Sequence, residues 1–186
     1  MKGIIQKKEA RSIEKAITFL VENINKTGKN PKPVILHSLE IAFYLLEKQY
    51  APEIVIAAIL HDILEDTEVK EGELKKEFGS EVVDIIKAVS YSEEIENWTE
   101  KYCDVFKRTL KQGKDALILK CADIYQNSFY IKLAKSTEFQ RELVEKIGYF
   151  LKISQGIIGS EVVWRDLEKQ YESEKRRIGG GFILKG

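Results

Sequence analysis

The chain has two histidines, and one of them heads a cluster of acidic side chains. His61 follows an apolar run over residues 54–60, and Asp62, Glu65 and Asp66 come directly after it. In a continuous helix His61 would stack over Glu65, and Asp62 over Asp66, each one turn apart. Ionised carboxylates beside a buried segment are costly unless they are paired or bind a cation. The cluster therefore indicates a cation site, although a core helix that simply ends in solvent explains it equally well.

The other histidine, His37, lies in the apolar opening of an expected helix, Val-Ile-Leu-His-Ser-Leu-Glu-Ile over residues 34–41. A single histidine in such a place is more often a hydrogen-bonded core residue than a metal ligand. His37 becomes a convincing candidate ligand only when it is considered together with the other polar groups of the chain.

A third polar group interrupts the apolar segment over residues 117–127. Lys120, Asp123 and Asn127 follow one another at intervals of three and four residues, so they share one stripe of a helix. Such a stripe is also typical of the wet face of an amphipathic helix. The strongly apolar residues around it favour a buried functional site instead.

Together, four of these side chains form a set with the chemistry of a metal centre. His37, His61, Asp62 and Asp123 supply two imidazoles and two carboxylates, which suit manganese, iron, cobalt or zinc. The two carboxylate charges balance a divalent cation, which makes a buried site tolerable. A metal in such a site lowers the pKa of bound water and polarises a phosphoryl group. The set therefore has the parts of a hydrolase.

Apolar residues recur with helical period almost throughout, and no convincing strand pattern or repeat appears. We predict an all-α, single-domain helical bundle over residues 1–178 and a flexible C-terminal tail over 179–186. Pro52 is expected in the first turn of a helix, Ser80 as a helix cap, and Thr137 with Gln140 as a capping box. The expected helices cover residues 13–24, 34–48, 52–60, 71–78, 80–91, 94–111, 115–133, 137–155 and 160–177.

The composition of the chain limits the kinds of partner that it is expected to bind. The 186 residues include 30 Lys and Arg and 30 Asp and Glu, so no bulk field attracts nucleic acid or an anionic membrane. The alternating charges of residues 164–177 indicate a solvated helix face. No segment resembles a signal peptide, and the run over 54–60 is far shorter than the roughly 20 residues that span a bilayer. Only two cysteines, Cys103 and Cys121, are present, so we expect a cytoplasmic protein without a disulfide scaffold; its oligomeric state stays open.

The candidate ligands resemble, in order and spacing, the H…HD…D signature of the HD-domain superfamily. The run His-Asp-Ile-Leu-Glu-Asp-Thr over residues 61–67 is similar to the HDxxEDT box of the RelA/SpoT-type alarmone hydrolases. The run Lys-Cys-Ala-Asp-Ile-Tyr-Gln-Asn over residues 120–127 resembles their KLADRxxN element, and residues 77–82 look like the helix junction after the box. The resemblance covers roughly residues 27–131, a little over half of the chain.

This resemblance implies a helical bundle of the HD type that removes pyrophosphate from guanosine 3′,5′-bis(diphosphate), with manganese as the usual metal. It implies that Glu65 and Asp66 orient or deprotonate the attacking water. Asn127 would contact the nucleotide sugar or position its helix, and Lys120 would meet a phosphate or form a structural ion pair. The metal ligands carried over from the signature are His37, His61, Asp62 and Asp123.

The segment before the first histidine departs from the family pattern. The family usually has a basic residue and an SGEPY-like segment there, whereas residues 25–37 are a few residues longer and lack Glu-Pro-Tyr. Lys26, Lys29 or Lys32 would have to supply the basic contact, with Lys26 as the candidate substrate-binding residue. Ile124 stands where an arginine commonly follows the motif aspartate. The expected partner is thus a small-molecule nucleotide, and two alternatives remain: hydrolysis of another nucleotide or phosphomonoester, or a catalytically silent nucleotide-binding module.

Overall fold

The computed structural model describes residues 7–29, 33–92 and 94–179, and every regular element among them is helical, as the sequence predicts. The chain consists of two compact units, Met1–Leu119 and Lys120–Gly186. The prediction of one domain over residues 1–178 stays a prediction, and the predicted tail lies outside the described residues from 180 onward. The elements in chain order are α1 (Lys7–Thr27), α2 (Val34–Glu47), α3 (Pro52–Leu60), α4 (Ile63–Asp66), α5 (Glu71–Phe78), α6 (Ser80–Val89), α7 (Trp98–Gln112), α8 (Lys114–Ser128), the 3-10 turn η1 (Ile131–Leu133), α9 (Thr137–Ile158) and α10 (Val162–Gly179).

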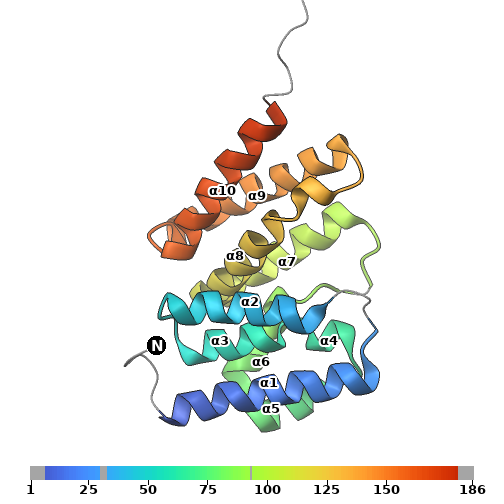
Figure 1. The fold of residues 1–186 in the computed structure, drawn as a ribbon, viewed down its shortest axis with the longest axis vertical. Helices are drawn as coiled ribbons and strands as arrows, with labels where there is room; N and C mark the ends of the chain where they lie inside the picture. The colour runs from blue at the N-terminus through green and yellow to red at the C-terminus, as the bar shows by residue number, and fades with distance from the viewer. Residues whose placement is uncertain (1–6, 30–32, 93, 180–186) are drawn as a thin grey trace, which may run out of the picture. The chain divides into compact units, whose positions relative to one another are not determined.

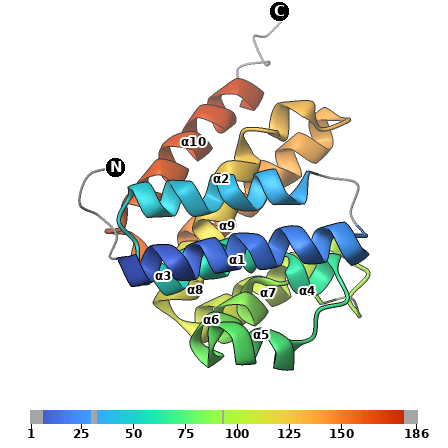
Figure 2. The same cartoon turned by 60° about the horizontal axis from the view of Figure 1, so that its bottom comes forward.

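The first unit is built around α3, which packs against α1, α2 and α6 (Figures 1 and 2). Every residue of α3 from Ile54 to Leu60 is buried, so this helix has no solvent face. Pro52 occupies the start of the helix, where its missing N–H costs nothing, as predicted. The burial of α3 places His61, the next residue, at the edge of the core.

The junction between α5 and α6 turns at Gly79, whose φ of 87° and ψ of 165° lie in a region that only glycine adopts readily. The prediction that Ser80 caps α6 was wrong. Gly79 is the capping position, and Ser80 is already the first helical residue. The extended, left-handed geometry at Gly79 redirects the chain at a point where no side-chain cap is made.

Replacing Gly79 by alanine is expected to lower the free energy of unfolding by about 1–3 kcal/mol, because the positive φ strains any Cβ. A Cβ at Gly79 would have no heavy atom within 4 Å, so the cost arises from the backbone alone. Gly72→Ala is the matched control, since Gly72 also has open space but lies within α5. That change is expected to stabilise slightly, by about 0.5–1 kcal/mol. Urea unfolding of both variants measures the difference, and equal effects would contradict it.

Helix α7 starts later than predicted, and α9 starts at Thr137 as predicted but with a different capping residue. Helix α7 begins at Trp98 rather than near residue 94, since the Asn97 side chain accepts a hydrogen bond from the Glu100 N–H at 3.0 Å. Helix α9 is capped by Ser136, whose hydroxyl accepts from the Phe139 N–H at 3.1 Å. The expected capping box from Thr137 to Gln140 is therefore absent.

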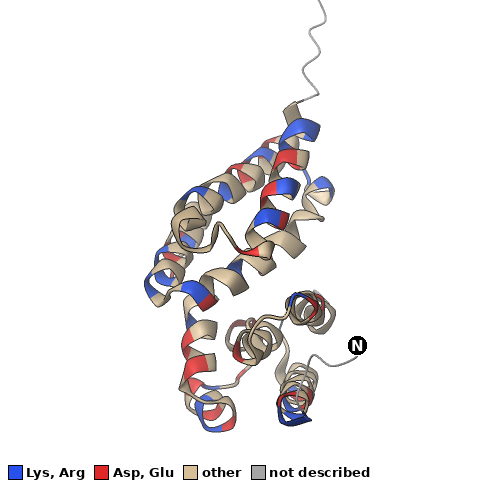
Figure 3. Cartoon of the chain, turned by 90° about the vertical axis from the view of Figure 1, so that its left-hand side faces the viewer, with Lys and Arg blue, Asp and Glu red and all other residues tan. Residues whose placement is uncertain are grey.

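The second unit contains the pair α9 and α10, which pack along each other. Trp164 donates from its indole N–H to the Ser154 hydroxyl at 3.1 Å, and both side chains are buried. Figure 3 shows Lys and Arg alternating with Asp and Glu along α10, as expected for a solvated helix face. Among the described residues, no helix combines the length and the hydropathy required to cross a membrane.

Candidate metal and phosphate site

His61 lies in a turn that separates the buried helix α3 from the short helix α4. The helix does not continue through Asp62 as assumed for the stacking of these side chains. Instead, Asp62 occupies the N-cap position of α4, and its carbonyl accepts from the N–H groups of Glu65 at 3.1 Å and Asp66 at 2.9 Å. The break turns the acidic cluster out of the core helix while His61 remains 3% exposed.

The ring of His61 is fixed by a hydrogen bond that it donates to a backbone carbonyl of α3. Its Nδ1 lies 2.8 Å from the Ala58 carbonyl oxygen. Because a carbonyl oxygen only accepts, Nδ1 must carry the hydrogen, and in the neutral ring the lone pair is then on Nε2. This is the arrangement found in many metal-binding histidines, where the second nitrogen is anchored by a backbone carbonyl.

The Nε2 atom of His61 lies 3.0 Å from Oδ1 of Asp62, so two electron-pair donors face the same small volume. Two acceptors at this distance repel unless a proton or a metal cation lies between them. The Asp62 side chain keeps 27% of its surface exposed and the His61 side chain 4%, so a cation here would be partly shielded from water. The donor set therefore fits a divalent cation.

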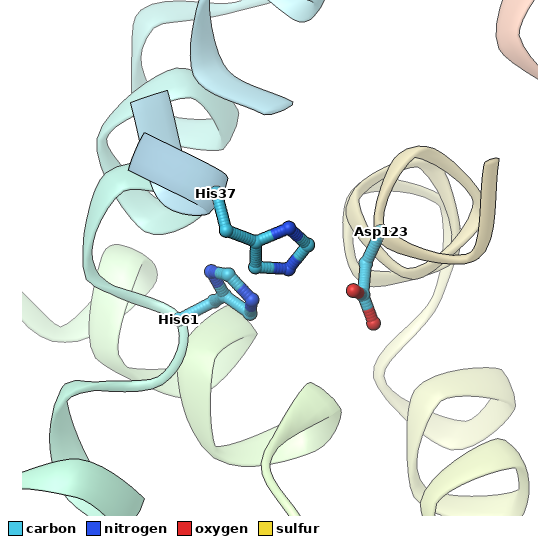
Figure 4. Close-up of side chains that lie close together, drawn as sticks. All are labelled: His37, His61 and Asp123. Carbon is cyan, nitrogen blue, oxygen red and sulfur yellow. The ribbon is translucent and has the colours of Figure 1, made fainter. Parts of the chain in front are cut away.

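His37 lies in the first turns of α2, with its ring edge-to-face on that of His61. The two ring centroids are 5.5 Å apart and the planes meet at 61° (Figure 4). Helix α8 carries the third side chain labelled in Figure 4, Asp123, which is 8% exposed. His37, His61 and Asp123 each offer one atom suited to a metal.

Both carboxylate oxygens of Asp123 accept hydrogen bonds from other residues of its own helix. Lys120 donates to Oδ2 at 2.9 Å, and Asn127 donates to Oδ1 at 2.5 Å. Lys120 is 2% exposed, so its ammonium group is compensated within the protein by this ion pair. The stripe predicted from spacing thus forms one hydrogen-bonded group, in which Lys120 and Asn127 orient the carboxylate.

The two acidic residues after Asp62 have different environments. Glu65 accepts a hydrogen bond at 2.7 Å from the backbone N–H of Tyr91, which follows α6. Asp66 is 8% exposed, and its backbone carbonyl accepts from the N–H of Lys29 at 2.9 Å. The end of the box is closed by Thr67, whose hydroxyl donates to the Ile63 carbonyl at 2.6 Å. The Thr67 hydroxyl thus satisfies a carbonyl group of the short helix α4.

The segment after α1 approaches the same end of the box. Besides the bond from Lys29 to Asp66, the Thr27 hydroxyl accepts from the Glu68 N–H at 3.2 Å. Lys26 is exposed in the last turn of α1, where it is available to an anionic ligand. Lys32, the other basic candidate, lies outside the described residues.

Glu65 also lines a cavity of about 620 Å³. Its lining combines Glu65 with basic and aromatic side chains from α6, α7 and the segment between them, among them Lys87, Tyr91, Arg108 and Lys111. The volume is within the range of ligand sites in proteins, roughly 300–1,000 Å³. Sequence reasoning missed this group, because Tyr91 and Arg108 lie in no motif and their approach to Glu65 depends on tertiary structure.

Neither cysteine belongs to the proposed ligand set. Cys103 and Cys121 are free thiols. Burial raises the pKa of the Cys121 thiol well above its usual value, and the charge of Asp166 raises it further. Cys121 therefore stays protonated and is a poor nucleophile or metal ligand.

The described part of the chain is all-helical, and His37, His61 and Asp123 are its candidate metal ligands. A family model described as an HD domain matches residues 16–147, which is more than half of the chain. The chain belongs to the HD-domain family.

Several relatives carry the name guanosine-3′,5′-bis(diphosphate) 3′-pyrophosphohydrolase. The guanosine-3′,5′-bis(diphosphate) 3′-pyrophosphohydrolase of Aquifex aeolicus is 30% identical over 152 residues, which are 75% of this chain and 22% of that protein. The enzyme of the same name from Haemophilus influenzae is 28% identical over 142 residues, covering 74% and 21% of the two chains. This chain thus spans about a fifth of the length of these relatives.

Solved structures share the fold. The structure of a metazoan ortholog of SpoT, described as hydrolysing ppGpp, aligns with a TM-score of 0.71 at 18% identity and covers 90% of this chain and 96% of its own. A crystal structure from Listeria monocytogenes aligns with a TM-score of 0.66 at 21% identity, covering 78% and 99%. These two likenesses establish the helical architecture.

Proposed function

We propose that this chain is a metal-dependent hydrolase that removes pyrophosphate from guanosine 3′,5′-bis(diphosphate). The observation that carries the proposal is the facing pair of donors, His61 Nε2 and Asp62 Oδ1, at 3.0 Å within the box over residues 61–67. Membership of the HD-domain family and the names of the relatives support the same reaction.

We propose that one divalent cation, manganese, is bound by His37, His61, Asp62 and Asp123. When bound, such an ion supplies Lewis acidity, which activates water near neutral pH and polarises a phosphoryl oxygen. The Ala58 carbonyl fixes the tautomer of His61. Lys120 and Asn127 limit the rotation of Asp123. These anchors reduce the conformational freedom that the ligands would otherwise lose on binding the ion.

Glu65 and Asp66 are the proposed acid–base residues. A carboxylate that can hydrogen-bond to the attacking water molecule can orient it and accept its proton. The hydrogen bond that the Tyr91 N–H donates to Oε1 restrains the Glu65 carboxylate. Asp66 is more buried, which favours a supporting role for it.

Substrate contacts are proposed for Asn127, Lys120 and Lys26. Lys26 is exposed and basic beside the end of the box, as contact with a phosphate requires. Lys120 is already paired with Asp123, so its main effect on a phosphate would be electrostatic, through the charge it adds near the metal ligands. Asn127 is fixed by Asp123 and is suited to a hydrogen bond with the sugar.

A second candidate function is hydrolysis of another nucleotide or a phosphomonoester. It is favoured by the segment over residues 25–37, which lacks the Glu-Pro-Tyr of the alarmone hydrolases, and by Ile124 in place of their arginine. These positions affect which base and sugar are accepted, whereas the proposed metal and acid–base residues stay unchanged.

A substrate panel separates the two functions. Protein purified without chelators and supplied with manganese is expected to release pyrophosphate from guanosine bis(diphosphate) and to leave dNTPs and nucleoside monophosphates intact. EDTA should stop the reaction and added manganese should restore it. Activity confined to the other phosphoesters would replace the alarmone by a different substrate. A metal-loaded protein inactive on the whole panel would favour the catalytically silent nucleotide-binding module.

A further inference from the structure

The peptide group between Ser90 and Tyr91 is hydrogen-bonded at both of its ends. Its N–H donates to Oε1 of Glu65 at 2.7 Å. Its carbonyl oxygen, on Ser90, accepts from Nη2 of Arg108 at 2.6 Å. A peptide group is planar and trans, so its C=O and N–H point in opposite directions and move together. Arg108 and Glu65 are therefore joined through one rigid unit.

Arg108 is itself fixed by three further bonds. Its Nε donates to the Asp104 carboxylate at 2.8 Å on the same helix, α7. Its Nη1 donates to the Lys87 carbonyl at 2.5 Å and to the Ala88 carbonyl at 3.5 Å, both in the last turn of α6. The planar guanidinium presents its donors in a fixed fork, so these bonds determine the plane in which Nη2 reaches Ser90. The side chain is tied to α7 at one end and to the end of α6 at the other.

We propose that Arg108 is a positioning residue for Glu65. The inference rests on the proposed function, in which Glu65 orients the attacking water. The positive guanidinium polarises the Ser90–Tyr91 peptide, which strengthens its N–H as a donor, since hydrogen bonds in series reinforce one another. It also restricts rotation of the peptide group. Both effects restrain one oxygen of the Glu65 carboxylate and so orient the other, although Arg108 need not touch the reacting atoms.

The kinetic test uses Arg108→Gln, which removes the charge and the fork. We expect kcat to fall about tenfold or more, with KM within about twofold and metal content unchanged, because misplacing a reacting group costs rate rather than binding. The matched control is Arg165→Gln. Arg165 also donates to a backbone carbonyl, that of Ser160 at 2.5 Å, but it lies on α10. The control should keep wild-type kcat.

A double-variant cycle separates positioning from general stability. If Arg108 acts through Glu65, adding Arg108→Gln to Glu65→Gln should slow turnover less than twofold further. Effects that multiply in the double variant would overturn the proposal. So would a rise in KM with unchanged kcat, which would make Arg108 a substrate contact in the cavity.

A readout without substrate distinguishes this proposal from the proposed function. With ¹⁵N-tyrosine labelling, the Tyr91 amide should exchange about tenfold faster in Arg108→Gln than in wild type, whereas core amides of α3 keep their rates. Glu65→Gln should shift the same amide signal, and Arg165→Gln should not. An unperturbed Tyr91 amide in Arg108→Gln would overturn the positioning role. A wild-type protein inactive on the alarmone, with the amide responding as expected, would overturn only the proposed function.

Discussion

Asp62→Ala is expected to abolish both metal binding and hydrolysis. The Asp62 carboxylate lies 3.0 Å from Nε2 of His61, so its removal takes away one donor of a facing pair and one of the negative charges that balance a divalent ion. Mutation of a residue that only orients a metal ligand typically lowers metal affinity or activity about 10–100-fold. Loss of a direct ligand is expected to cost more. Metal content after gel filtration and the rate of pyrophosphate release measure the two losses.

The fold is expected to survive this change, because the Asp62 side chain is partly exposed and makes no side-chain cap to α4. Asp115→Ala is the matched control, since it removes a carboxylate from the first turn of α8 without touching a proposed ligand. The control should retain metal and turnover. Wild-type metal content and turnover in Asp62→Ala, with the melting temperature unchanged, would remove Asp62 from the site.

The position of residues 61–67 at the end of a buried helix could be predicted from the sequence, because it depends mostly on local pattern. An apolar run long enough for two helical turns buries α3 on all sides, and the polar residues after it must then lie at its end. The local backbone conformation of this run was harder to predict. Helix α4 packs against α1 after the break at His61 and Asp62, and a helical period alone cannot show where a buried helix stops.

The capping residues of α7 and α9 were missed for a related reason. Asn97 and Ser136 are the N-caps, although nearby residues have a similar capping propensity. Which residue caps the helix depends on where the preceding chain enters it. Lys120 shows the same limit for the site, since its spacing to Asp123 predicts a shared stripe. Only its burial and its bond to Asp123 distinguish an orienting ion pair from a free phosphate contact.

The contacts of Glu65 were the hardest part of the site to predict from the sequence. Its hydrogen-bond donor, the Tyr91 N–H, is 26 residues away, and Arg108 is another 17 residues on. A backbone donor leaves no side-chain signature, and Arg108 looks like any charged residue of an amphipathic helix. Such groups become visible only when α6 and α7 are packed, because the packing brings the end of one helix to the side of the other.

Glu65→Gln is expected to keep the metal and to lower turnover by about a hundredfold or more. The amide has nearly the shape of the carboxylate, and its carbonyl oxygen can still accept from the Tyr91 N–H. It cannot accept a proton from water, and loss of an acid–base group costs about 10²–10⁴ in rate. Single-turnover rates and metal content of the same preparation test both halves of the expectation.

Glu81→Gln is the matched control, because Glu81 is an exposed glutamate in the first turn of α6 and should tolerate the same change at full rate. Asp66→Asn, made in parallel, distinguishes the two carboxylates of the box. If Glu65 is the acid–base group, Asp66→Asn should lose less turnover than Glu65→Gln, since Asp66 is more buried and less accessible to a water molecule. Unchanged turnover in Glu65→Gln, with a large loss in Asp66→Asn, would transfer the role to Asp66 and remove the catalytic reason for the Arg108 contact.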